Sequence, residues 1–161
     1  MAGDAAQVSV FVRVPPDVAF EVFTTEIDLW WKQGPKFRVA GRQRGQLVFE
    51  PGENGRLFES FPGGTFEVGR VIGWEPPARL ELEWRGPNYD PGQKTFVEVR
   101  FVAANDGTMV TVRHRGFAAL PDGHPVRHGQ DGAAFARMLG MWWGELMTSL
   151  REHATRPAST G

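Results

Sequence analysis

The chain has 161 residues, with 18 basic side chains against 19 acidic ones and a formal net charge of −1. A chain so close to neutrality has no summed electrostatic field to attract nucleic acid or anionic lipid. Because it contains no cysteine, disulfides, thiolate nucleophiles and cysteine-ligated metal sites are excluded.

The hydrophobic segments are short. The longest apolar run, residues 138–144, falls far below the roughly 20 residues that a membrane-spanning helix needs. The first residues lack the basic charge and apolar stretch of a secretion signal. We therefore expect one cytoplasmic domain over residues 1–161, with a core over 8–153 and a flexible tail over 154–161. We expect no nucleic-acid partner, no membrane insertion, no metal and no cofactor.

The first predicted strand covers residues 8–14, where valine occupies every second position. Pro15 and Pro16 end this strand, because proline cannot donate to a neighbouring strand and is well suited to the first turn of a helix. Apolar residues at helical spacing then predict a short helix to about residue 24. A second short helix is expected to follow, opened by Thr25 and Asp28 as a capping-box pair.

Residues 46–115 alternate between apolar and polar side chains and are interrupted by turn formers. Asn54 and Gly55 tolerate positive φ, which predicts a hairpin between strands at 46–50 and 56–60. Half-buried strands joined by short turns indicate an antiparallel meander rather than a parallel sheet. Further strands are expected over residues 65–74, 80–85, 97–101 and 110–113.

The last predicted element is a helix over residues 131–153. Its apolar residues recur at spacings of three and four. At 1.5 Å per residue its length is roughly 34 Å, enough to cross a small domain. Its apolar stripe is so wide that it needs burial on more than one side.

Several segments resemble one branch of the START/SRPBCC superfamily, the homologues of the activator of heat-shock-protein ATPase. The similar segments are residues 14–24, the Trp30–Trp31 pair, residues 69–80 with Trp84, and residues 111–117. The resemblance covers residues 8–153. It implies an α+β helix-grip fold, in which a curved antiparallel sheet of about seven strands wraps a long C-terminal helix, with two short helices after the first strand.

The same resemblance implies a cavity between sheet and helix that takes up small hydrophobic molecules, often with no catalytic step. The chain departs from many relatives in a polar, turn-rich segment over residues 118–131. We expect this segment to cover one end of the cavity.

Aromatic residues are the main candidates for binding a ligand, since the chain has six tryptophans and twelve phenylalanines. Such residues ordinarily fill a core, but they also line pockets for apolar ligands. One tryptophan of each adjacent pair is expected to face away from the other. The predicted ligand-contacting residues are Trp30, Trp31, Arg70, Trp84, Val112, His114, Phe135, Met138, Leu139 and Trp142.

His114 and Arg70 are the polar members of this set. His114 continues the face of Val110 and Val112 and should point inward. It is then satisfied by a backbone or carboxylate group, or it orients a polar group of the ligand. Arg70 also falls on an apolar face, unless a bulge marked by Gly69 and Gly73 turns it outward.

His124 and His128 have the spacing of a metal-binding helix. Pro125 and Gly129 make a helix there unfavourable, so we predict no metal site.

The leading functional hypothesis is a carrier or sensor of a small hydrophobic or aromatic molecule, without a defined reaction. One alternative is an enzyme, such as a cyclase, dehydratase or hydrolase of aromatic or polyketide-like substrates, with His114 as acid or base. Another is a chaperone-interacting protein. Whether the chain is a monomer or a homodimer stays open.

Overall fold

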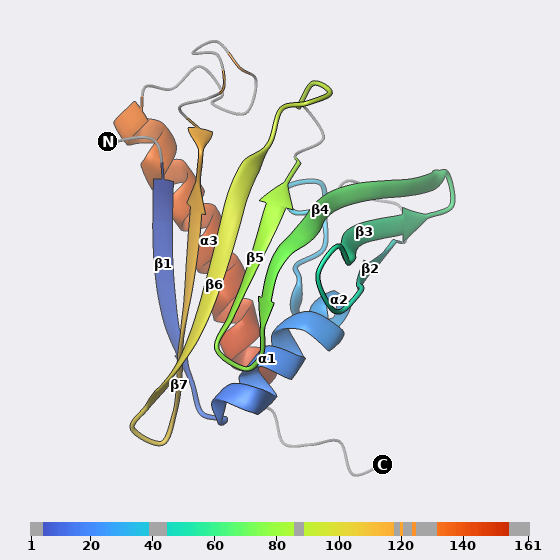
Figure 1. Cartoon of the computed structure of the whole chain (residues 1–161). Coiled ribbons are helices and arrows are strands. Elements are labelled where there is room, and N and C mark those ends of the chain that lie inside the picture. The colour runs from blue at the N-terminus through green and yellow to red at the C-terminus, as the bar shows by residue number, and fades with distance from the viewer. Residues whose placement is uncertain are drawn as a thin grey trace.

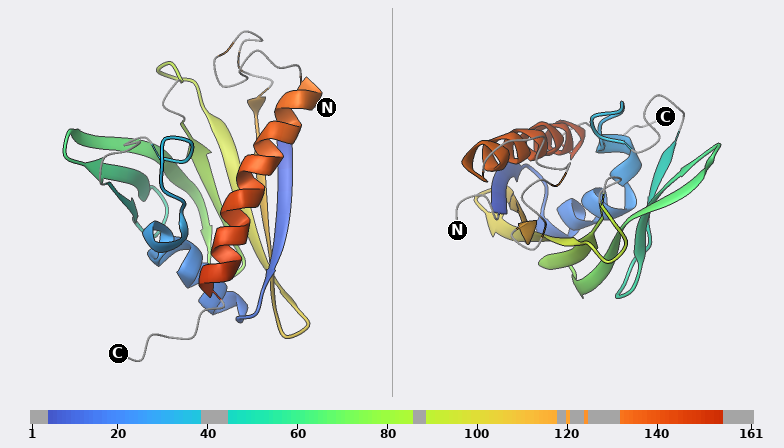
Figure 2. Two further views of the ribbon diagram at one scale, coloured as in Figure 1. Left: turned by 180° about the vertical axis from the view of Figure 1, so that it is seen from behind. Right: turned by 90° about the horizontal axis from the view of Figure 1, so that it is seen from above.

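The computed structural model describes residues 5–38, 45–85, 89–117, 120, 124 and 132–154. It shows an α+β fold in which a curled sheet carries its helices on the concave side (Figures 1 and 2). The elements in chain order are β1 (Ala5–Val12), α1 (Pro16–Thr25), α2 (Ile27–Trp30), β2 (Gln46–Phe49), β3 (Arg56–Phe61), β4 (Gly64–Glu75), β5 (Arg79–Trp84), β6 (Thr95–Ala104), β7 (Gly107–Arg115) and α3 (Gly132–Ala154).

The sheet has seven strands in the order β1-β7-β6-β5-β4-β3-β2. Every neighbouring pair is antiparallel. Strands β2 to β7 follow one another as a meander, and β1 joins the far edge beside β7. The α3 helix crosses the concave face and packs most closely against β1. The predicted helix-grip architecture is confirmed.

The alternating pattern of the strands determines which residues enter the core. Leu80, Val99 and Val112 stand opposite one another on β5, β6 and β7 and are fully buried. Because side chains alternate between the faces of a strand, the residues between them point to the convex side. His114, two residues beyond Val112, shares the concave face and is 2% exposed.

The convex side carries a network of ion pairs. Glu81 and Glu98 lie directly opposite each other on β5 and β6, where like charges destabilise a sheet. Arg79 lies between them, with its guanidinium 2.9 Å from the Glu81 carboxylate and 2.5 Å from that of Glu98. Its hydrogen bonds to Glu98 and Glu75 raise the pKa of Arg79. The negative charges of Glu81 and Glu98 on this polar face are thus compensated by Arg79.

Two register shifts interrupt the pairing of β4, one with β3 and one with β5. At Gly69 a Cβ atom would approach the Glu83 carbonyl oxygen to 2.8 Å, so only glycine permits this close approach. The irregularity turns Arg70 to the convex side, where it pairs with Glu67 at 2.8 Å. The inward orientation expected for Arg70 is wrong, and the alternative of a bulge is confirmed.

The start of α2 also differs from expectation. Thr25 is the last residue of α1, and no side chain caps α2. The Asp28 carboxylate accepts a hydrogen bond from the Leu47 amide instead. Trp31 follows α2 in an extended conformation, which frees it from helical spacing. Trp30 and Trp31 are both buried, and their ring centroids lie 5.4 Å apart. Because the two rings contact each other, the expectation that one faces away from the other is wrong.

Most of the segment 118–131 lies outside the described residues, as does the tail beyond residue 154. The expected roles of that segment as a cover and of the tail as a flexible end stay predictions. Within the described part of the chain, no helix is both long enough and apolar enough to cross a membrane.

Candidate functional site

Five tryptophans meet between the sheet and α3. We call them the tryptophan cluster: Trp30, Trp31, Trp84, Trp142 and Trp143. The Trp31 ring is central, with its centroid 5.4 Å from Trp30, 6.0 Å from Trp84 and 5.8 Å from both Trp142 and Trp143. Aromatic pairs at such separations attract one another beyond the effect of burial. The cluster joins α2, β5 and α3 into one apolar site.

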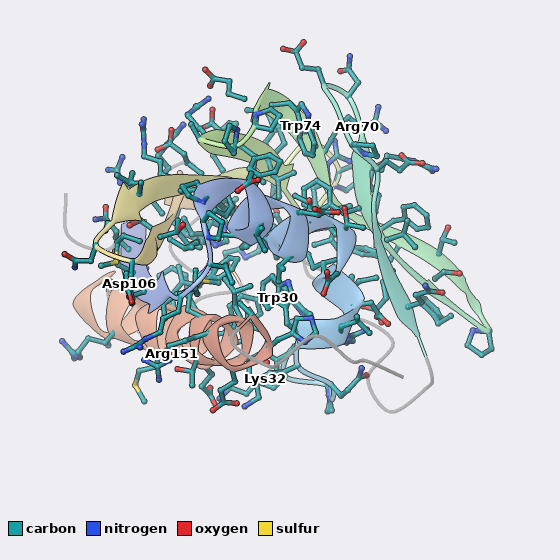
Figure 3. All side chains as sticks on the ribbon, turned by 90° about the horizontal axis from the view of Figure 1, so that it is seen from below. Trp30, Lys32, Arg70, Trp74, Asp106 and Arg151 are labelled. Carbon is teal, nitrogen blue, oxygen red and sulfur yellow. The ribbon has the colours of Figure 1, made fainter. Side chains whose placement is uncertain are left out.

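Trp30 anchors the cluster to α1. Its indole N–H donates to the carbonyl oxygens of Val22 and Phe23 at 3.2 and 3.3 Å. In Figure 3 Trp30 lies inside the molecule, between α2 and α3, whereas Arg70 lies at the periphery. The carbonyl of Trp30 in turn accepts a hydrogen bond from Ser149 of α3. Both ends of this residue are therefore held, and the ring has a defined position.

A buried arginine fixes the chain that follows the cluster. Arg38 is 4% exposed, and its guanidinium donates to the Asp28 carboxylate at 2.6 Å and to the Trp31 carbonyl at 2.7 Å. It also donates to the carbonyls of Asp28 and Lys32. A buried guanidinium is tolerated only when its donors are satisfied in this way. Arg38 therefore sets where Trp31 can lie.

Residues 31–38 dock on α3 at the rim of the tryptophan cluster. The Trp142 indole donates to the Lys36 carbonyl at 2.8 Å, and its ring stacks on Phe37 with centroids 5.7 Å apart. Lys36 also pairs with Glu145 at 2.5 Å and lowers the pKa of that carboxyl. This pair is exposed, so its contribution to stability is small.

His114 is the polar centre of the site. The centroid of its ring lies 5.7 Å from that of Trp84, in an edge-on contact, and 4.6 Å from that of Phe117, in a tilted contact. Its Nδ1 atom accepts a hydrogen bond from the Trp143 indole at 3.2 Å, and its Nε2 atom lies 2.7 Å from the Thr95 hydroxyl. Burial lowers the pKa of His114 to about 3. The imidazole is therefore neutral at physiological pH, with both nitrogens occupied.

The structure brings the predicted ligand-contacting residues together, except for Arg70. Trp142 and Met138 are partly buried. The others lie buried on the inner side of the fold: Trp30, Trp31, Trp84, Val112, His114, Phe135 and Leu139. His114 is satisfied by an indole and a hydroxyl rather than by the expected backbone or carboxylate group. That these residues bind a ligand stays a prediction.

Sequence reasoning missed several residues of the site. The predicted set of ligand-contacting residues omits Trp143, Thr95 and Tyr89. The hydroxyl oxygens of Tyr89 and Thr95 lie 3.1 Å apart. The alternation of β6 could have placed Thr95 inward with Val97.

The described residues hold no group of three or more histidine, aspartate or glutamate side chains arranged to bind a metal ion. His128, half of the histidine spacing noted in the sequence, lies outside the described residues. His124 is described, and its Nε2 atom lies 2.7 Å from the Gln93 side-chain oxygen. Since that oxygen only accepts, the ring nitrogen must donate.

The sequence profile of the family described as "Activator of Hsp90 ATPase homolog 1-like protein" matches residues 13–153. The chain belongs to this family. The match spans the described elements from the end of β1 to α3, which agrees with the resemblance noted in the sequence. No sequence among the curated proteins matches the chain.

Several solved structures share the fold. An HSP90 activator from Plasmodium falciparum is 16% identical with a TM-score of 0.65, over 96% of this chain and 99% of that one. The Aha1 dimer from Colwellia psychrerythraea is 14% identical with a TM-score of 0.63, over 98% of both chains. Txn09, an anthrahydroquino-gamma-pyrone synthase, is 28% identical with a TM-score of 0.57, over 94% of this chain and 99% of that one.

Proposed function

We propose that the protein binds a small hydrophobic or aromatic molecule between the sheet and α3, as a carrier or sensor that performs no reaction. The observation that carries the proposal is the tryptophan cluster, in which Trp84 and Trp143 flank one neutral, hydrogen-bonded imidazole. Tryptophans offer large flat surfaces for a planar apolar ligand. The partly buried Met138 adds a flexible side chain that adapts to ligand shape.

The state of His114 supports binding rather than catalysis. A general acid or base works best with a pKa near the operating pH, and burial moves the pKa of His114 to about 3. Both ring nitrogens already have protein partners. An imidazole in this state can orient its neighbours, but it is too weak a base to take a proton from a substrate near neutral pH, and its one N–H is already used in a hydrogen bond.

Two methionines on α3 allow a matched test with the planar probe 9-fluorenone. Met138 packs against the core, whereas Met141 is 72% exposed. We expect Met138→Ala to raise the dissociation constant of the probe at least about threefold, because a buried apolar contact is lost. Met141→Ala should leave it unchanged. Equilibrium dialysis measures both; no saturable binding by the wild type, or equal effects of the two variants, would contradict the proposal.

A second candidate is an enzyme acting on aromatic or polyketide-like substrates. It is favoured by the similarity to Txn09, whose name describes a synthase. Incubation with 1,8-dihydroxyanthrone, followed by liquid chromatography and mass spectrometry, distinguishes the two candidates. Binding without turnover, in the wild type and in His114→Ala alike, eliminates the enzyme. Protein-dependent conversion of the probe to a product of different mass or retention time supports it.

Chaperone interaction is the remaining alternative, favoured by the family's description and by the Plasmodium falciparum neighbour. Co-purification with Hsp90 would support it, and failure to bind purified Hsp90 would eliminate it. We place the protein in the cytoplasm, where such partners act. The dimeric Colwellia psychrerythraea structure motivates a homodimer, which sedimentation equilibrium tests.

A further inference from the structure

Four side chains from separate parts of the chain form one line of hydrogen bonds. It runs from Trp143 of α3 to His114 of β7, then to Thr95 of β6, and ends at Tyr89 between β5 and β6. The successive distances between donor and acceptor atoms are 3.2, 2.7 and 3.1 Å. The first three residues are at most 2% exposed, whereas Tyr89 is only partly buried. The line therefore leads from the core to the edge of the site.

The direction of the first two bonds follows from the chemistry of the groups. An indole N–H can only donate, so the Nδ1 atom of His114 must accept the bond from Trp143 and carries no proton. A neutral imidazole has one N–H, which must then be on Nε2. His114 therefore donates to the oxygen of Thr95.

The third bond is directed by burial. Thr95 is 0% exposed. Leaving its hydroxyl proton without an acceptor would therefore cost the full desolvation penalty of that donor. Among the described residues, the acceptor within reach of that hydroxyl is the Tyr89 oxygen. Thr95 thus donates to Tyr89, and the Tyr89 O–H must point away from Thr95.

Tyr89 stays protonated over the physiological range, because burial raises its pKa further above the ordinary value. Its ring is held edge-on against His124, with centroids 5.3 Å apart. No hydrogen bond from the Tyr89 hydroxyl to a second described residue is present beside the one to Thr95. The line of bonds therefore ends in an O–H donor of fixed orientation at a partly exposed position.

We propose that the Tyr89 hydroxyl donates a hydrogen bond to an acceptor oxygen of the ligand, so that the site selects planar aromatic ketones or quinones over the corresponding hydrocarbons. This inference rests on the proposed function, because it assigns a chemical class to the same ligand. A site built to donate a hydrogen bond rejects an analogue without the acceptor, since the buried donor is then left unpaired.

The test compares 9-fluorenone with fluorene, two planar molecules of the same outline that differ in the carbonyl. The measured quantity is the ratio of their dissociation constants, determined by equilibrium dialysis in the wild type and in Tyr89→Phe. The difference in hydration between the probes cancels when the two proteins are compared. We expect the preference for fluorenone to fall about tenfold in the variant, because fluorenone loses its donor and fluorene no longer leaves a donor unpaired.

A second measurement uses the wild type alone. The chain has a single tyrosine, so 13C labelling of the phenolic carbon gives one NMR signal from Tyr89. Fluorenone should shift this signal and fluorene should leave it in place.

The outcomes separate the two proposals. Equal binding of both probes, with no change in Tyr89→Phe, overturns the ketone preference and leaves the binding function standing, with water alone at the hydroxyl. An unshifted Tyr89 signal on saturation with fluorenone does the same. Failure of both probes to bind overturns the binding function and this inference together.

Discussion

The His114 imidazole is held between an indole donor and a hydroxyl acceptor, and burial keeps it neutral. In the unfolded chain a histidine has its ordinary pKa of about 6.5. Between that value and about 3, the unfolded state therefore binds one proton more than the folded state. The contribution of His114 to stability is fully present above pH 6.5 and is lost as the pH falls toward 3.

A pH series of urea unfolding checks this sign. Below pH 6.5 the free energy of unfolding should fall by about 1.4 kcal/mol per pH unit on account of His114. In His114→Gln this part of the slope should vanish. Parallel curves for the two proteins would show that the imidazole is accessible to protons in the folded state.

At the same scale, the sequence predicted the orientation of His114 but not its partners. Alternation along β7 placed it with Val112, because strand periodicity is local. Trp143 and Thr95 are 29 and 19 residues away along the chain. Helical spacing along α3 predicts Trp142 as a member of the site and Trp143 only as a residue that widens the apolar stripe. The packing of α3 against the sheet buries Trp143 and leaves Trp142 partly exposed.

At the scale of elements, Arg38 joins α2, the segment after it and β2. Its guanidinium binds Asp28, whose carboxylate also accepts the amide of Leu47 at 2.8 Å. The exposed pair of Arg56 and Glu50 has a similar geometry at 2.9 Å, and the hydrogen bonds from Arg56 lower the pKa of Glu50 to about 2. Solvent screens that pair, whereas the Arg38 guanidinium is buried and its partner Asp28 is only partly exposed.

The two arginines therefore form a matched comparison. Arg38→Met should lower the free energy of unfolding by about 3 kcal/mol, because it leaves a carboxylate and three carbonyl groups without their buried donor. Arg56→Met should have little effect. Chemical denaturation measures both. Similar losses in the two variants would mean that burial does not distinguish these ion pairs.

The elements themselves were largely predictable, and the exceptions have local causes. β-Strands and α3 follow the periodicity of apolar residues, which the sequence displays directly. The orientation of Arg70 depended on a register shift beside Gly69, which periodicity alone cannot locate. The start of α2 depended on Asp28 binding Arg38 and Leu47, and these partners are distant in the sequence.

At the scale of the whole molecule, the curled sheet and α3 gather most of the tryptophans into one interior site. Trp74 is the internal control, because it packs against Phe20 and Phe49 instead, with ring centroids 5.0 and 6.1 Å apart. A planar ligand between sheet and helix would therefore change the surroundings of indoles in the tryptophan cluster and leave Trp74 in its original surroundings.

The most direct test is a two-dimensional 1H–15N NMR titration of the tryptophan indole signals with 9-fluorenone. Binding in the proposed site should shift the signals of Trp31, Trp84, Trp142 and Trp143 along saturable curves that share one dissociation constant, while the Trp74 signal stays in place. Shifts confined to Trp74, or no saturable shift in the tryptophan cluster, would contradict a ligand site between the sheet and α3.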